Sequence, residues 1–472
     1  MEKSFEGWLF QGVLVVVLAS GLVGCTTYKQ QNKIAPYWRQ SNIAGALKEA
    51  DVVVKSSGTG KDAIVWTLEQ ATVLRAADKC IQSVEAFNNA EDRIDKYLEE
   101  AKTKLANEGG ALLANQAVLP YRGRFYDGIM LNTYKALNHL QMNEPEKARV
   151  ELNRAAQRQK DAVEDNKKRI EKVQDAVEKD KEKDRIKKAE DNKAFQGQVN
   201  TNMVNELDQM KVYGDYVNPF TVYLDGLFFM ANPTSGSDVE RARKAFQEVN
   251  GYVDNKYVKA DFAAMEEVVQ QSKAIPPMTY VIFETGCAPV REQIRIDIPI
   301  MLPQVPYVGA AFPKLKLQGD FAAGLTVTAN GTNETTAMVC SMDSVIGLDF
   351  KNELPTIITK PVASTIVKAA AAYGVVEGSR QAGGNYAKVA AKIAMAAYQA
   401  AVNIADLRTW TTLPKEFQVC RIPTPPDRKI ELATTNGGQT KTVTVAEGTY
   451  NIVYVRSISA SGPLLISQIK LK

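Results

Sequence analysis

Apolar and polar residues alternate along this chain with two different periods. Between residues 41 and 275, apolar positions recur every three to four residues, which is the spacing of amphipathic helices. From about residue 276 the period becomes two, as in half-buried strands, apart from an Ala-rich stretch at 362–408 that predicts a helical hairpin. We therefore expect an α+β protein, with an α-helical N-terminal region and a β-rich C-terminal region.

Three segments of the helical region space their small residues as tetratricopeptide repeats do. Small residues are needed where the two helices of a hairpin cross closely. A set of generic antiparallel helices with small residues at the crossings is the alternative. The matching positions are Ala71, Ser83, Phe87 and Ala90 in 63–94, Ala136, Ala148, Leu152 and Ala155 in 127–157, and Gly226, Ala242, Phe246 and Val249 in 220–249.

Residues 160–193 form a charged arm within the helical region, with 12 basic and 11 acidic side chains. Val163, Ile170 and Val177 repeat every seven residues, and Val173 adds one further apolar contact. We expect a long helix whose distal half projects into solvent and carries charge pairs at i,i+4. Self-association or partner binding through this arm and a merely solvated helix both fit the pattern.

The β-rich region begins with strands at 279–283 and 293–298. Residues 298–313 then carry no charge and contain four prolines, so they are predicted to be neither a membrane-spanning helix nor a central strand. Burial beneath the β region is favoured over an exposed loop that docks on a partner or on lipid.

Strands follow again at the C-terminal end. Residues 442–445 and 450–455 flank Gly448 and predict a hairpin, and a last strand is expected near 464–471. The expected regions are a helical domain at 41–275, a mixed β domain at 276–420 that contains the helical hairpin 362–408, and a β-sandwich-like segment at 421–472.

The first 24 residues are predicted to be a signal peptide. Their apolar run is short for the ~30 Å core of a bilayer, although an uncleaved membrane helix is the alternative. The segment ends in Leu22-Val23-Gly24-Cys25, which resembles the lipobox of bacterial lipoproteins. The resemblance implies cleavage before Cys25, a diacylglyceryl group on its thiol, and a lipidated tether at 25–40. Thr26 after the cysteine favours the outer membrane, facing the periplasm, over the inner membrane.

Composition and charge exclude some classes of function. The net charge of +4 is too small to indicate a nucleic-acid partner, and 45% hydrophobic with 24% charged residues is typical of a globular protein. The remaining cysteines lie in no CxxC pair, so we expect no zinc and mostly free buried thiols, with any disulfide pairing left open. They are Cys80, Cys287, Cys340 and Cys420.

Residues with catalytic chemistry are sparse. His139 is the single histidine, and its place at the end of a predicted helix favours a surface or capping role. The run Gly58-Thr59-Gly60-Lys61 has Lys55 where a P-loop has its first glycine and continues with Asp62, so a loop is expected. No cofactor and no enzymatic activity are predicted.

Four stretches in order resemble an uncharacterised family of bacterial lipoproteins with tetratricopeptide-like repeats. The resemblance covers roughly residues 40 to 472, and its most specific part is Asp406-Leu-Arg-Thr-Trp-Thr-Thr-Leu-Pro414. It implies export and a repeat architecture without an established activity, often beside lipoproteins that activate peptidoglycan synthases. Arg124 and the charged arm depart from the family pattern. The stretches are 121–159, 218–226, 280–299 and 405–414.

The signature residues Asp406, Arg408 and Trp410 are candidates for a functional site or for a structural clasp between helices and sheet, and the clasp is favoured. Helical repeats offer concave grooves for partner segments, so we expect a scaffold that binds envelope proteins. A glycan- or peptidoglycan-binding module is the second hypothesis, although Tyr450, Tyr454 and Trp410 are dispersed. An envelope hydrolase is the third.

Overall fold

The computed structural model describes residues 32–103, 117, 119–211, 213–302, 305–381, 404–435, 437–438 and 440–472. The signal peptide at 1–24, the lipobox residues Leu22, Val23 and Gly24, the lipidation site Cys25, and most of the second half of the expected helical hairpin lie outside these residues.

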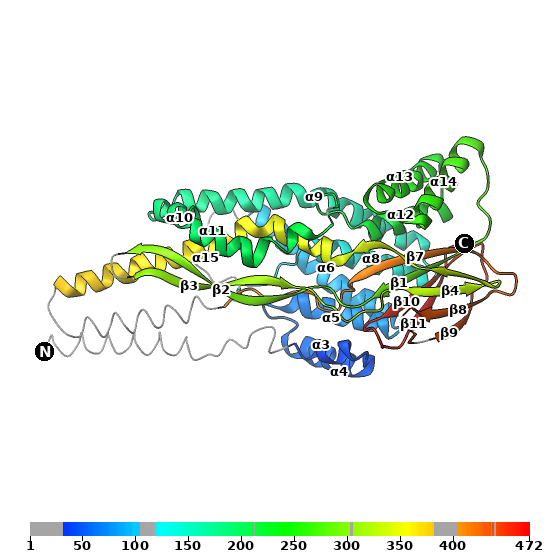
Figure 1. Ribbon diagram of the computed structural model, residues 1–472, viewed down its shortest axis with the longest axis horizontal. Coiled ribbons are helices and arrows are strands. Elements are labelled where there is room, and N and C mark those ends of the chain that lie inside the picture. Colours follow the sequence, from blue (N-terminus) through cyan, green and yellow to red (C-terminus); the bar gives the residue numbers. More distant parts are fainter. Residues whose placement is uncertain are drawn as a thin grey trace.

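The expected α+β fold class is confirmed, with helices in the N-terminal part and sheets in the C-terminal part (Figure 1). Consecutive helices pair as hairpins, namely α5 with α6, α8 with α9, and α12 with α13. The helices are α3 (Ile34–Arg39), α4 (Ile43–Ser57), α5 (Ala63–Ala76), α6 (Cys80–Thr103), α8 (Phe125–Gln141), α9 (Pro145–Glu178), α10 (Lys183–Glu190), α11 (Lys193–Val199), α12 (Pro219–Ala231), α13 (Gly236–Tyr252), α14 (Lys256–Gln271) and α15 (Met342–Gln381), with short turns η2 (Asn200–Val204) and η3 (Leu207–Gln209).

The small residues that predicted the three hairpins lie at the helix crossings. All twelve positions are buried. A Cβ atom on Gly226 of α12 would lie 2.9 Å from the ring of Phe246 on α13, so glycine is needed at that crossing. In the first hairpin, the Ser83 hydroxyl donates to the Ala71 carbonyl at 2.7 Å.

The strands form two sheets and one separate hairpin. The five-stranded sheet has the order β11-β10-β1-β7-β6, the four-stranded sheet has the order β5-β4-β8-β9, and β2 pairs only with β3. Within the larger sheet β1 and β10 run parallel. The strands are β1 (Met278–Thr285), β2 (Val290–Leu302), β3 (Val305–Lys316), β4 (Leu325–Ala329), β5 (Thr332–Thr335), β6 (Ala337–Ser341), β7 (Glu416–Pro423), β8 (Lys429–Thr434), β9 (Thr440–Thr444), β10 (Tyr450–Ser457) and β11 (Leu465–Lys470).

Two expectations for the C-terminal strands are wrong in detail. Strands β9 and β10 flank Gly448 but do not pair, because β9 pairs with β8 in the smaller sheet and β10 pairs with β1 and β11 in the larger one. The expected boundary between residues 420 and 421 falls inside β7. Residues on both sides of it therefore share one sheet.

The molecule is elongated, with a head and a stalk (Figure 1). The head contains both sheets with α3–α8, the first half of α9 and α12–α14. The stalk contains residues 160–178 of α9, α10, α11, the β2–β3 hairpin and α15, which pack on one another. No helix among the described residues has both the length and the apolar character needed to cross a bilayer.

The charged arm does not project freely into solvent. Helix α9 ends at Glu178 and the chain returns through α10, and both helices pack on α15. The buried stripe on α9 runs through Ala162, Val173 and Val177, whereas Val163 is 48% exposed. The buried stripe therefore starts one residue before the expected seven-residue seam, and α15 packs on this helix.

Two further boundaries differ from the sequence-based expectation. Residues 34–39 of the expected tether form α3, and Ile34 and Trp38 are fully buried in the head. The first half of the expected helical hairpin is the end of α15, which begins twenty residues earlier than expected, at Met342, and runs through Pro355 and Pro361. Residues 404–408, the expected end of the second helix, have no helical structure.

The charge-free stretch 298–313 is the outer part of the β2–β3 hairpin, packed on α11 and α15 rather than beneath a sheet. Ile298, Ile300 and Val308 are buried, as favoured from the sequence, whereas Met301 and Tyr307 are exposed. Prolines fit here because both strands are edges.

Candidate functional site

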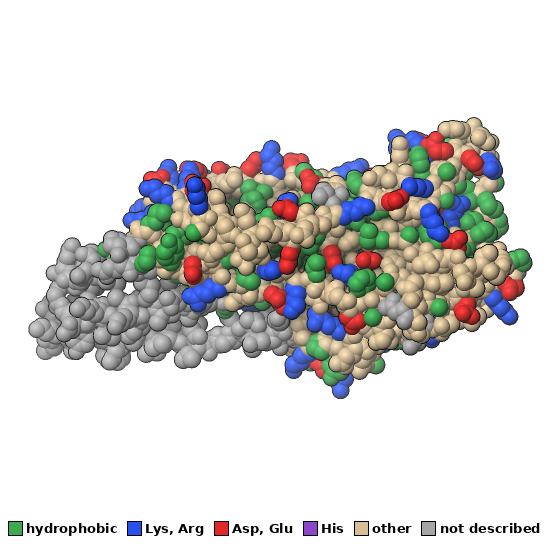
Figure 2. Space-filling model, viewed as in Figure 1, with side chains coloured by type: hydrophobic (Ala, Val, Ile, Leu, Met, Phe, Trp, Pro, Cys, Tyr) green, Lys and Arg blue, Asp and Glu red, His purple; other side chains and the backbone are tan. Residues whose placement is uncertain are grey.

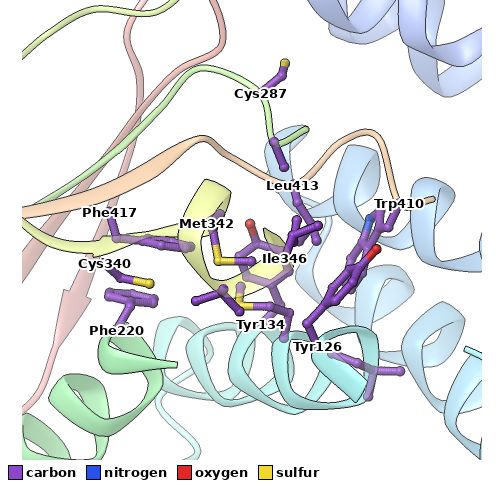
Figure 3. Close-up of a cluster of buried hydrophobic side chains, with 14 of the residues drawn as sticks. Tyr126, Tyr134, Phe220, Cys287, Cys340, Met342, Ile346, Trp410, Leu413 and Phe417 are labelled. Atoms are coloured by element: carbon purple, nitrogen blue, oxygen red, sulfur yellow. The ribbon is translucent and has the colours of Figure 1, made fainter. Parts of the chain in front are cut away.

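The inner face of the helical array is covered by the chain's own sheet. Helices α5, α8 and α12 are buried around most of their circumference, as expected only for helices enclosed on all sides. The hydroxyl of Tyr134 on α8 donates to Glu284 Oε1 on β1 at 2.5 Å. The ring of Phe220 on α12 stacks on Phe417 of β7, with centroids 3.9 Å apart (Figure 3). The face where repeat proteins usually bind a partner is therefore occupied.

Residues 405–413, which we name the clasp, lie between this array and the sheet. Glu69 of α5, a fully buried carboxylate, accepts three hydrogen bonds from the clasp. The Thr411 N–H and hydroxyl donate to Oε1 at 2.7 and 2.6 Å, and the Thr412 N–H donates to Oε2 at 3.1 Å. A buried carboxylate is stable only with such donors. Glu69 thus fixes the clasp to α5.

Trp410 fills the space between α5, α6 and α8. Its indole N–H lies 2.9 Å from the hydroxyls of both Thr72 and Thr412, and its side chain is fully buried. Its ring centroid is 5.9 Å from those of Phe87 and Tyr134. Figure 3 shows Trp410 on the clasp directed toward Tyr126 and Tyr134 of α8. The structure therefore places this signature residue at the helix–sheet junction.

Asp406 and Arg408 form an ion pair at the start of the clasp. The Arg408 Nε donates to Asp406 Oδ1 at 2.7 Å, and its Nη1 donates to Asp62 Oδ1 at 3.1 Å and to the Leu119 carbonyl at 2.6 Å. Burial alone would raise the pKa of Asp406, but Arg408 and Arg124 outweigh it and lower the pKa to about 2. The pair connects the clasp to the segments before α5 and α8.

A second group of charges, which we name the hub, lies where the stalk leaves the head. Glu353 of α15 accepts hydrogen bonds from Arg124 before α8 at 2.6 Å and from Arg291 of β2 at 3.1 Å. Arg124 also reaches Asp406 of the clasp at 3.4 Å. Burial opposes ionisation of Glu353, yet Arg124 and Arg291 hold its pKa below the usual value. The hub joins α8, α15, β2 and the clasp.

Two buried carboxyls near the hub have raised pKa values, in contrast to Glu353. Burial and the neighbouring Glu353 raise the pKa of Asp349 well above its usual value, and neither of its side-chain oxygens has a hydrogen-bond partner among the described residues. Burial also raises the pKa of Asp127 to about 6, although the Tyr121 hydroxyl (2.5 Å) and the Arg124 N–H (2.8 Å) both donate to it. The fold therefore favours the protonated form of both carboxyls.

Glu284 is the corresponding centre within the sheet. It accepts the hydroxyls of Tyr134 and Tyr454, each at 2.5 Å, and pairs with the guanidinium of Arg456. Arg456 in turn donates to the Thr412 carbonyl of the clasp at 2.7 Å. Clasp, helix α8 and strands β1 and β10 are thus linked through one buried carboxylate.

The other candidate residues are placed apart from these groups. His139 lies near the end of α8 as expected but is buried and not on the surface, and its Nδ1 is 2.7 Å from Glu144 Oε2 across the α8–α9 turn. Residues 58–61 form the turn between α4 and α5. The described residues contain no cluster of histidine, cysteine and acidic side chains suited to a metal. All four cysteines of the described region, Cys80, Cys287, Cys340 and Cys420, are buried free thiols.

Sequence analysis found Asp406, Arg408 and Trp410 but missed their partners. Glu69, Glu284 and Glu353 were not singled out, although Glu69 and Glu284 each interrupt an apolar run that must be buried. An isolated acid in such a run needs a buried partner, which is the signal that identifies it. The charged groups of the clasp and the hub bond to one another and to backbone groups. The arrangement therefore joins separate elements of the fold.

No family model, no curated protein and no solved structure matches this chain.

Proposed function

We propose that this chain is a lipid-anchored, periplasm-facing protein of the outer membrane that acts as a non-catalytic scaffold for other envelope proteins. The lipid is attached at Cys25. The resemblance to lipoproteins with helical repeats supports this assignment, and its association with activators of peptidoglycan synthases favours partners in cell-wall assembly.

The observation that carries the proposal is the short connection between the anchor and the core. Asn32 follows Cys25 by seven residues, and its side-chain amide donates to the Thr411 hydroxyl of the clasp at 3.2 Å. Trp38 is fully buried, with the Arg456 guanidinium 4.5 Å from its ring centroid. At ~3.5 Å per residue, the link spans at most ~25 Å. An anchored chain would therefore hold its head and stalk close to the membrane.

Partners are expected on the outer surface of the helical array, because the inner face is filled. The second helices of the hairpins, α6, α9 and α13, lie outside α5, α8 and α12. Ile81 on α6 is 67% exposed and Val150 on α9 is 47% exposed. Ile81 and Val150 are therefore accessible probe positions on this outer surface.

The anchor is tested by Cys25→Ser. We expect the variant to lose its acyl chains and to fractionate away from membranes, because each buried methylene contributes ~0.8 kcal/mol to membrane binding. Mass spectrometry of the N-terminus separates loss of the lipid from retention by an uncleaved signal peptide. A processed, unlipidated chain that still fractionates with membranes would contradict the proposal.

The scaffold is tested by photo-crosslinking in intact cells from residue 81 or 150. We expect discrete crosslinked products with envelope proteins from these positions. A probe at Val269 on α14, which is 44% exposed but lies outside these second helices, is the matched control and should give no intermolecular product. Retention of the chain on purified sacculi without any protein crosslink would support the glycan-binding alternative instead.

A further inference from the structure

Near the tip of the β2–β3 hairpin, two large apolar side chains of the described stalk are exposed. Met301 is 48% exposed and Tyr307 is 56% exposed. No charged residue occurs between Asp297 and Lys314. Ile298 and Val308 on the opposite face are buried, so the tip is apolar on both faces. Figure 2 shows hydrophobic side chains gathered at the end of the described body where this hairpin lies.

The edges of the hairpin are unsuited to pairing with a further strand. The Asp297 N–H donates to Gln198 Oε1 on α11 at 3.4 Å, so it points away from β3. Along β2, the backbone N–H groups at every second residue from Asp297 also point away from β3, and Pro299 occupies one of these positions without an N–H. On β3, Pro313 pairs with Gln293 and likewise occupies an outward-pointing position, so it blocks the edge of β3. Prolines at such positions prevent strand addition.

An inclined stalk allows the anchor and the tip to contact the same surface. Asn32 bonds to Thr411 of the clasp, and the Ala405 N–H of the clasp donates to Gln293 Oε1 near the base of β2 at 3.0 Å. Gln293 and Leu302 are nine residues apart, which is ~30 Å of strand at ~3.3 Å per residue. The link from Asn32 to Cys25 spans up to ~25 Å. The link is shorter than the strand alone, so the lipid on Cys25 and the hairpin tip meet one surface when the stalk is inclined along it.

We propose that the tip of the β2–β3 hairpin inserts into the lipid surface that holds Cys25, with Met301 and Tyr307 in the interfacial layer. This inference rests on the proposed lipid anchor. Tyrosine is favoured at that depth because its ring is apolar and its hydroxyl remains hydrated. The insertion gives the anchored protein a second contact with the membrane and so fixes the direction of the stalk.

The test places an environment-sensitive nitrobenzoxadiazole dye on Tyr307→Cys in the full lipidated chain, reconstituted in vesicles of phosphatidylethanolamine and phosphatidylglycerol. The native thiols at 80, 287, 340 and 420 are buried, so the new cysteine is the one that reacts in the folded protein. Met301→Cys is a second position. Val269→Cys on α14, 44% exposed in the head, is the matched control.

We expect the emission from positions 307 and 301 to shift to the blue and to be quenched by lipids that carry a nitroxide on the acyl chain. Emission from position 269 should remain that of a hydrated dye. A blue shift at 307 without lipid quenching would identify a protein contact and would overturn the inference. A hydrated, unquenched dye at both tip positions on protein that still floats with the vesicles also overturns it, while the anchor stands. Protein that does not float refutes the anchor and the inference together.

Discussion

The head and the stalk use charged residues in opposite ways. In the head, Glu284 is 1% exposed and accepts hydrogen bonds from two tyrosines and an arginine between a helix and a sheet. In the stalk, the Lys168–Glu164 pair has side chains 55% and 72% exposed on one helix. The stability of the fold depends on the partners of a buried carboxylate, whereas an exposed ion pair contributes little to stability. The charge density of a segment therefore says little until its burial is known.

The apolar residues show the same contrast. The first helices of the head hairpins have no exposed face, and layers of helix and sheet enclose them. In the stalk, α9 buries a single stripe that includes Ala162, Val173 and Val177. Stability should accordingly be concentrated in the head, and the following changes test that difference, from the largest expected effect to the smallest.

Glu284→Ala should be the most damaging change. It leaves the Arg456 guanidinium buried without its partner, and loss of one member of a buried pair costs about 3–5 kcal/mol of unfolding free energy. The matched change is Asp208→Ala, which removes an exposed partner of Lys351 on α15 of the stalk and should cost less than about 1 kcal/mol. Denaturant unfolding of the full chain measures both. Equal losses would remove the distinction drawn between the two regions.

Asp127→Asn should change the pH dependence of stability. Because burial raises the pKa of Asp127 to about 6, the fold favours its protonated form. Its contribution is complete below the unfolded pKa of ~3.9 and is lost as the pH rises through about 6. Relative to wild type, the variant should gain about 2–3 kcal/mol between pH 4 and pH 7, at ~1.4 kcal/mol per pKa unit.

Asp406→Asn should change the pH dependence of stability in the direction opposite to Asp127→Asn. Arg408 and Arg124 lower the pKa of Asp406 to about 2, against its burial, so its contribution is present above pH ~4 and is lost as the pH falls toward 2. The variant should therefore lose more stability at pH 7 than at pH 3. Parallel pH profiles for both variants would show that the two carboxyls do not differ as described.

Ala136→Leu or Ala148→Leu should overpack the crossing of α8 and α9. Both alanines are fully buried, and extra methylene groups in such a site cost about 1–3 kcal/mol. Thermal unfolding measures the change. An unchanged melting temperature for both variants would mean that the crossing can expand, contrary to the tight packing described for the head.

Val308→Ala and Tyr307→Ala compare two neighbouring residues of the stalk. Val308 is 2% exposed, so removing two methyl groups should cost about 1.5 kcal/mol. Tyr307 is 56% exposed, and its truncation in the protein without a membrane should change stability by less than about 0.5 kcal/mol. Similar losses at both positions would indicate that the exposed tip is packed.

The helical hairpins were predictable because their evidence is local. Small residues at fixed intervals mark a helix crossing whatever lies outside it, and Ala71, Ala136 and Ala242 occupy crossings as expected. The α+β class followed in the same way from the change in period near residue 276. The positions of Asp406, Arg408 and Trp410 were singled out, and a site at the helix–sheet junction was expected for Trp410.

Long-range pairing was not predictable. Whether β9 pairs with β8 or with β10 depends on which sheet each strand joins, and the alternation around Gly448 is the same in both cases. The arm was assigned to solvent because its composition is charged, but the apolar stripe that meets α15 becomes evident only once α15 is known to extend to Gln381. Glu353 became recognisable only when Arg124 and Arg291, distant in sequence, were found beside it.

The bonds between Glu69 and the clasp also constrain the order in which the chain can fold. They join residues separated by 342 positions or more, and β1 pairs with a strand that begins at residue 450. Contacts so distant in sequence form slowly. Helix α5 is complete early in synthesis, yet the donors that the clasp supplies to its buried carboxylate are absent until residue 412 has arrived. The N-terminal hairpins are consequently not a finished unit before the last strands join, and the unassembled chain keeps apolar surface exposed for that interval.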